Sequence, residues 1–155
     1  MPRNWVSIDK MKYKNDSLAF TFSILGLLAN VLYFFTLYQH NDNYYYSYLL
    51  GISVIYNLIF MLAVFLAGEE VKTYHRNYAY VLLALGIVQI LRIFFYPRIA
   101  LNAGKMEEKK YWELAIMLAI SGIMLILGAI RCFRNTTLLK LYKEGKLKVS
   151  PTDEV

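Results

Sequence analysis

The sequence has one cysteine, three prolines and two histidines in 155 residues. Because Cys132 has no second cysteine to pair with, the chain is not a disulfide-stabilised secreted domain. His40 and His75 fall at opposite ends of different apolar segments, and the sequence contains no His-Glu-x-x-His segment, glycine-rich phosphate loop or aspartate cluster. We therefore expect no metal site, no cofactor and no enzymatic activity.

Charged residues are almost missing from four stretches, although they make up 18% of the chain. The four stretches cover residues 18–39, 47–68, 78–97 and 112–133. About 20 helical residues cross a hydrocarbon core about 30 Å thick, so each stretch is long enough. Runs such as residues 114–120 are apolar on every face, which excludes the alternating strands of a β-barrel. A soluble enzyme or a disordered chain would not separate charge in this way.

These stretches predict an all-α fold: a polytopic membrane protein with a bundle of four transmembrane helices. Residues 1–155 then form a single membrane domain with basic tails, 1–17 and 134–155. The third stretch contains Arg92, which costs about 2.5–3.5 kcal/mol at depth, but eleven Val, Leu, Ile and Phe residues contribute roughly −3 to −6 kcal/mol. Insertion of the third stretch is therefore favoured.

Residues at the ends of the stretches predict where the helices begin and end. Asp16 or Ser17 can cap the first helix, and Gly68 can end the second. Pro97 predicts an end or a kink in the third helix, with a further turn before a stop at residues 102–104.

Lysine and arginine residues predict the orientation of the bundle. With both termini in the cytoplasm, twelve of them near the helix ends lie inside and four lie outside. We expect a multi-pass protein of the plasma membrane with cytoplasmic termini. The net charge of +6 then reflects this topology and the lipid bilayer as partner, and it does not indicate nucleic acid.

A tyrosine run stands in the first loop, where Tyr44, Tyr45 and Tyr46 follow Asn41-Asp42-Asn43. Tyrosine rings settle at the headgroup level of a bilayer, so the run is typical of an aromatic belt. It also fits an external surface that binds a sugar, a peptide or a partner protein, because tyrosine offers both stacking area and a hydroxyl group. The sequence leaves both interpretations open.

Polar residues inside the stretches mark a candidate intramembrane site. Asn30 and Asn57 lie near the middle of adjacent antiparallel helices and can form a hydrogen bond with each other. This bond would either hold the two helices together or belong to a polar site within the membrane. On the third helix, Gln89 and Arg92 share one face. Arg92 has three possible environments: an ion pair with Glu113, extension to the outer interface, or contact with a ligand or partner subunit.

Small residues form one stripe on the first helix and another on the fourth. The stripes are Ala19, Ser23, Gly26 and Asn30, and Ala115, Ala119, Gly122 and Ala129. Such stripes let helix backbones approach closely in lipid, and they predict buried faces. The buried partner is either within the chain or in another subunit.

The C-terminal residues 138–148 alternate apolar and cationic side chains. This pattern predicts a short basic amphipathic segment that lies on the cytoplasmic leaflet. Charge that stops helix translocation would produce the same pattern.

No motif is specific enough to indicate a family, so two functional hypotheses remain. The first is a structural or accessory subunit of a membrane complex, such as a transporter or secretion system, with a membrane-protein partner or a second copy of the chain. The second is a small oligomeric transporter or channel in which Asn30, Asn57, Gln89 and Arg92 line a path for a polar or anionic solute.

Overall fold

The computed structural model describes residues 15–38, 48–104 and 106–144, and the regular elements in these ranges are helices. The long helices are α2 (Ser17–Tyr38), α3 (Tyr48–Lys72), α4 (Arg76–Leu91) and α6 (Glu108–Lys143). A 3₁₀ helix, η1 (Arg92–Phe94), and the short helix α5 (Tyr96–Asn102) connect α4 to α6. The predicted all-α fold is confirmed for the described residues.

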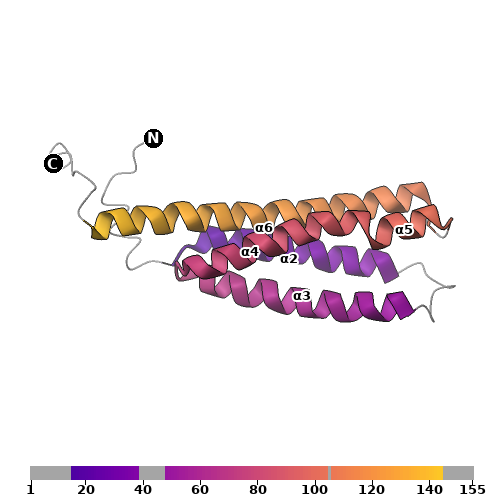
Figure 1. Cartoon of the computed structure of the whole chain (residues 1–155), viewed down its shortest axis with the longest axis horizontal. Coiled ribbons are helices and arrows are strands. Elements are labelled where there is room, and N and C mark those ends of the chain that lie inside the picture. The colour runs from indigo at the N-terminus through magenta and orange to yellow at the C-terminus, as the bar shows by residue number, and fades with distance from the viewer. Residues whose placement is uncertain (1–14, 39–47, 105, 145–155) are drawn as a thin grey trace.

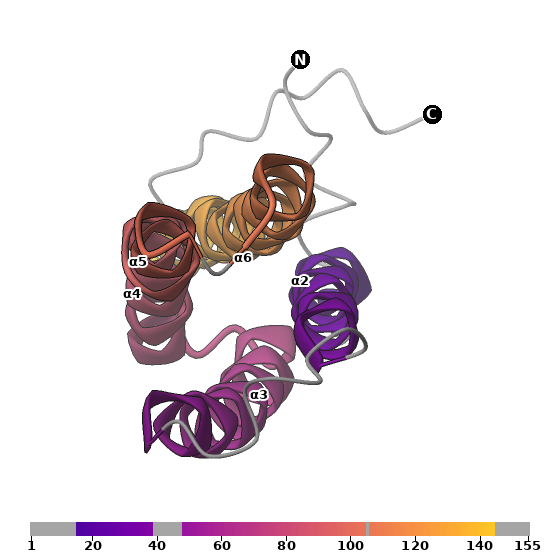
Figure 2. The ribbon, with the colours of Figure 1, turned by 90° about the vertical axis from the view of Figure 1, so that its right-hand side faces the viewer.

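The four long helices run up and down and form a ring (Figures 1 and 2). Helix α6 packs extensively against α2 and α4, and α3 closes the ring against the same two helices with little contact to α6. We name the two ends of the bundle after one residue each. The Asp16 end holds the starts of α2 and α4 and the end of α3, and the Trp112 end holds α5 and the start of α6.

The bundle buries polar side chains and exposes apolar ones. Asn30, Asn57 and Gln89 have no exposed surface, whereas Ile59 is 63% and Phe94 is 65% exposed. A water-soluble protein shows the opposite distribution, while in lipid the polar groups must be satisfied inside the protein. Four helices of the described chain are long and apolar enough to cross a membrane, as expected of a multi-pass membrane protein.

Small residues bring α6 into backbone contact with two neighbours. Ser121 Oγ donates a hydrogen bond to the backbone oxygen of Gly26 on α2, at 2.7 Å. A Cβ atom added to Gly122 would lie 2.8 Å from the backbone oxygen of Gly86 on α4 and 2.5 Å from Ile90. Any larger residue at Gly122 would therefore push the two helices apart.

Both predicted stripes of small residues face the interior of the bundle. The buried members are Ala19, Ser23, Gly26 and Asn30 on α2 and Ala115, Gly122 and Ala129 on α6, with Ala119 half-buried. Their packing partners belong to the same chain, because α6 contacts α2 and α4 along these faces. The small residues of both stripes are thus used for contacts between helices of this chain.

The predicted helix ends are confirmed at two places and wrong at a third. The Oδ1 atom of Asp16 accepts a hydrogen bond from the Ala19 backbone N–H at 3.2 Å, which caps α2. Helix α5 ends at Asn102, and Gly104 has a positive φ of 64°. Gly68 does not end α3, which continues to Lys72. Gly68 instead lets α3 approach α2, since an added Cβ would lie 3.1 Å from the Cβ of Ser23.

Helix α6 is longer than the predicted span. It has 36 residues, which corresponds to about 54 Å at helical rise, and it projects past the other helices at the Asp16 end (Figure 1). The predicted surface segment at 138–148 is therefore wrong for residues 138–143, which continue the axis of α6. Residues 145–148 lie outside the described residues. Beyond the predicted end at residue 133, Asn135 and Thr136 still contact the bundle, through Asp16 and Tyr74.

Candidate functional site

Arg92 lies at the point where helix α4 loses its regular geometry. The α-helix ends at Leu91, η1 follows, and Pro97 lies in the first turn of α5. Proline lacks an N–H group, and its ring clashes with the carbonyl four residues earlier, so a regular helix does not continue through it. The predicted break near Pro97 is confirmed, and it divides the third span, Arg76–Asn102, beside Arg92.

The guanidinium group of Arg92 points into the bundle and contacts two other helices. Its Nη1 atom donates to Asn57 Oδ1 at 2.7 Å, and its Nη2 atom donates to Ser53 Oγ at 3.2 Å. The rings of Tyr33 and Tyr56 lie on it, with centroids 4.8 and 4.5 Å from the Cζ atom. Two hydrogen bonds and two cation–π contacts thus fix the charge between α2, α3 and α4.

The positive charge of Arg92 has no carboxylate partner within the described part of the chain. Two of the expected environments are therefore wrong. Glu113 is exposed on α6 and does not pair with Arg92, and Arg92 is only 7% exposed, so its side chain does not reach the outer interface. The physical reason is the packing of α4, which directs this side chain toward α3.

A second polar layer contains Asn30 and Gln89. The Nε2 atom of Gln89 donates to Asn30 Oδ1 at 2.5 Å and joins α4 to α2. The predicted bond between Asn30 and Asn57 is wrong, because both groups of Asn57 are engaged elsewhere. Its Nδ2 atom donates to the Ser53 backbone oxygen at 2.9 Å, and its oxygen accepts from Arg92.

Several buried polar atoms in and beside this layer have no hydrogen-bond partner among the described residues. They are the Nδ2 atom of Asn30, the Oε1 atom of Gln89 and the hydroxyl of Tyr56. Exchanging the oxygen and nitrogen of both amides would reverse their bond but still leave one amide nitrogen and one amide oxygen unbonded. Buried polar groups are nearly always bonded, so this layer has spare capacity for water or a polar molecule.

The residues that contact Arg92, together with the bonded pair Asn30 and Gln89, form one group that we call the Arg92 cluster. Its seven members are Asn30, Tyr33, Ser53, Tyr56, Asn57, Gln89 and Arg92. The cluster offers one fixed positive charge, neutral hydroxyl and amide groups, and no carboxylate, histidine or thiol. Such a set can bind an anion or a polar solute, but it lacks the base needed to activate a nucleophile.

A second polar cluster lies at the Asp16 end. The buried carboxylate of Asp16 accepts from Arg131 Nε at 3.2 Å and from the amide of Asn135, both on α6, and it caps α2. The backbone N–H of Asp16 donates to the Lys72 backbone oxygen at 3.0 Å, which ties in α3. We call Asp16, Lys72, Arg131 and Asn135 the Asp16 cluster. Its charges are paired, and it joins three helices.

The sequence identified four members of the Arg92 cluster and missed three. The sequence marked four polar residues within the spans, and the structure brings them together: Asn30, Asn57, Gln89 and Arg92. It did not mark Tyr33, Ser53 and Tyr56, which also contact Arg92. A signal for Ser53 is its position four residues before Asn57, on the same face of α3. Tyrosines inside an apolar helix give no comparable signal, because they resemble interfacial aromatics.

The predicted external surface, Tyr44, Tyr45 and Tyr46, lies outside the described residues. Within the described ranges, no three histidine, cysteine, aspartate or glutamate side chains gather as a metal site would require. Comparisons with protein-family models, with curated proteins and with solved structures find no match to this chain.

Proposed function

We propose that the chain is a small membrane transporter or channel that binds an anionic or polar solute at the Arg92 cluster. The observation that carries the proposal is the buried guanidinium of Arg92, whose hydrogen-bond partners among the described residues are neutral and include no carboxylate. Charged groups inside a membrane are costly, and they mark substrate or ion pathways more often than structural contacts.

The neutral partners support anion binding. Asn57 and Ser53 orient the guanidinium without neutralising it, so its positive charge remains available inside a medium of low dielectric constant. An arginine kept only for stability gains more from a carboxylate, because a buried unpaired charge is destabilising. The unbonded atoms of Asn30 and Gln89 would contact the polar parts of the same solute.

The interruption of α4 also supports passage through the bundle. Membrane transporters place their binding sites beside discontinuous helices, where the broken segment can move separately from the rest. Here the break from α4 through η1 to α5 begins at Arg92 itself. A change at the break would therefore move the binding group directly.

The alternative role as an accessory subunit retains less support. It rested on the absence of catalytic groups and on two stripes of small residues, and both stripes are used for contacts within the chain. The lack of a nucleophile and a base in the cluster is compatible with either role. A complex partner, or a second copy of the chain, remains a proposal that the experiment below separates from transport.

We propose that both termini lie in the cytoplasm and that the protein resides in the plasma membrane. The argument for the termini is the excess of lysine and arginine near the Asp16 end. Fusing a fluorescent protein or alkaline phosphatase to the C-terminus tests the orientation. We expect fluorescence without phosphatase activity, and phosphatase activity would reverse the assignment.

Transport can be tested with purified protein in liposomes loaded with potassium chloride, acetate or phosphate. Valinomycin carries potassium, so the release of salt reports the passage of the anion. We expect faster release of at least one salt than from protein-free liposomes. Arg92→Gln should slow it about a hundredfold, because the charge that attracts the anion is lost, and Arg92→Lys should retain part of the rate.

The matched control is Arg98→Gln, which removes one exposed positive charge from α5. This variant should release salt at the wild-type rate. Equal rates for the wild-type protein and Arg92→Gln, or no release above empty liposomes, would contradict transport. Stoichiometric recovery of a partner in mild detergent would then favour the accessory role.

A further inference from the structure

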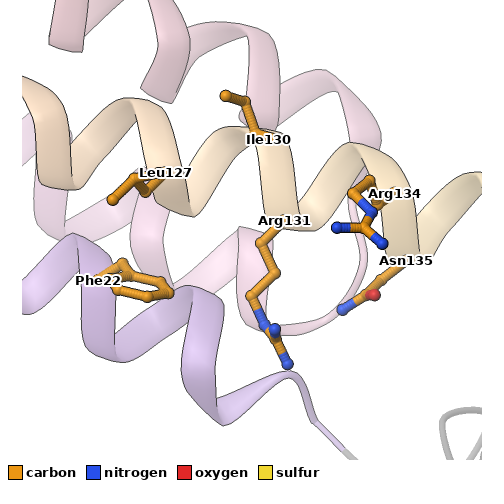
Figure 3. A pocket seen from close by; sticks show the side chains of 6 residues that line it. All are labelled: Phe22, Leu127, Ile130, Arg131, Arg134 and Asn135. Atoms are coloured by element: carbon orange, nitrogen blue, oxygen red, sulfur yellow. The ribbon is translucent and has the colours of Figure 1, made fainter. Parts of the chain in front are cut away.

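A hollow of about 200 Å³ lies between α2 and α6 at the Asp16 end, far from the Arg92 cluster along the bundle. Its lining residues are Phe22, Leu127, Ile130, Arg131, Arg134 and Asn135 (Figure 3). One comes from α2 and the other five from α6. The hollow is partly open, so a molecule in the surrounding bilayer can reach it.

The lining changes from apolar to polar along the helix axis. Phe22 and Leu127 lie at one end of the hollow, and Arg134 and Asn135 lie at the other (Figure 3). Eight residues separate Leu127 from Asn135, which is about 12 Å along α6. This gradient follows the change from hydrocarbon to headgroup at the edge of a membrane.

The polar end of the hollow has an excess of positive charge. Arg131 pairs with Asp16, and its side chain is 29% exposed. Arg134, one turn further along α6, is exposed and forms no ion pair with any described acidic side chain. The charge of Arg131 is balanced by Asp16, and the positive charge of Arg134 remains available.

We propose that this hollow binds one anionic phospholipid. The phosphate of the headgroup contacts Arg134 and the exposed side of Arg131, and an acyl chain lies along Phe22, Leu127 and Ile130. Basic pockets between transmembrane helices bind such headgroups, and guanidinium groups suit phosphate oxygens. A free anion leaves the apolar end uncovered, and the choline group of a zwitterionic lipid meets unfavourable positive charge.

The test is native mass spectrometry of the full chain in mild detergent, with phosphatidylglycerol or phosphatidylcholine of the same acyl chains. The wild-type protein should retain one phosphatidylglycerol about fivefold more strongly than phosphatidylcholine. Arg134→Gln should abolish this preference. The matched control is Arg98→Gln at the Trp112 end, which also removes one exposed arginine. It should keep the preference for phosphatidylglycerol, because Arg98 does not line the hollow.

A second variant tests the hollow independently of its charge. Leu127→Trp fills the apolar end and leaves both arginines in place, so it should also lose the retained lipid. Equal retention of both lipids by the wild-type protein, or an unchanged preference in Arg134→Gln or Leu127→Trp, would overturn the proposal. Displacement of the lipid by millimolar inorganic phosphate would assign the site to a free anion and also overturn it.

Discussion

Among the residues that the structure describes, Asp16 and Arg92 are buried charges in opposite settings. At the Asp16 end, the carboxylate of Asp16 pairs with Arg131, accepts from Asn135 and caps α2. In the other half of the bundle, Arg92 is similarly buried, and its partners in the described ranges are a neutral hydroxyl, a neutral amide and the faces of two tyrosine rings. Within the described residues, the first charge is neutralised by Arg131, and the second has no carboxylate partner.

Under the proposed function, this difference separates a structural charge from a solute-binding charge. A buried charge with a full set of partners joins helices, and removing it leaves the partners uncompensated. A buried charge without an opposite partner costs stability, and the proposed function explains its presence by the binding of a solute. The Asp16 cluster is therefore expected to govern stability, and the Arg92 cluster to govern binding.

The largest loss of stability is expected for Asp16→Ala. The substitution removes the cap of α2 and leaves Arg131 and Asn135 without their acceptor. We expect the free energy of unfolding to fall by about 3 kcal/mol, as measured by titration with sodium dodecyl sulfate in mixed micelles. The control is Glu113→Ala, an exposed position on α6, which should change this free energy by less than about 0.5 kcal/mol.

The Asp16→Ala protein, assayed in the same liposomes, should release salt at the wild-type rate per folded molecule. A loss of transport as large as that of Arg92→Gln would remove the distinction between the two clusters. Unchanged stability would show that the Asp16 contacts do not hold α2 to α6.

A smaller effect is expected for the bond between Asn30 and Gln89. A double-mutant cycle with Asn30→Leu, Gln89→Leu and the double variant measures their coupling. We expect about 0.6–1.7 kcal/mol, because hydrogen bonds between membrane helices are modest and each amide has an unbonded group. A coupling near zero would mean that the two residues do not form the observed bond in the bilayer.

The four spans were predictable from the sequence because the length of an apolar run is a local property. The start of α2 directly after its cap Asp16 and the break near Pro97 follow from cap and proline chemistry within a few residues. The error at Gly68 arose because a helix end also depends on packing. Here the glycine allows α2 and α3 to approach and does not terminate α3.

The composition of the candidate site was partly predictable, and its pairing was not. Polarity at depth identifies Asn30, Asn57 and Arg92, but the rotation of each helix about its axis decides which of them meet. The bonded residues Asn30 and Gln89 stand 59 positions apart, and no local pattern favours this pair over Asn30 with Asn57. Tertiary packing fixes that choice.

The stability of Arg92→Gln, compared with that of Asp16→Asn, tests the central claim most directly. Glutamine keeps an amide donor near Asn57 and removes the buried charge, whereas asparagine keeps the cap and removes the partner of Arg131. The account predicts that Arg92→Gln leaves the free energy of unfolding unchanged or raises it by up to about 1 kcal/mol, while Asp16→Asn lowers it. A loss of about 3 kcal/mol in Arg92→Gln would contradict the account, because Arg92 would then be a structural charge like Asp16.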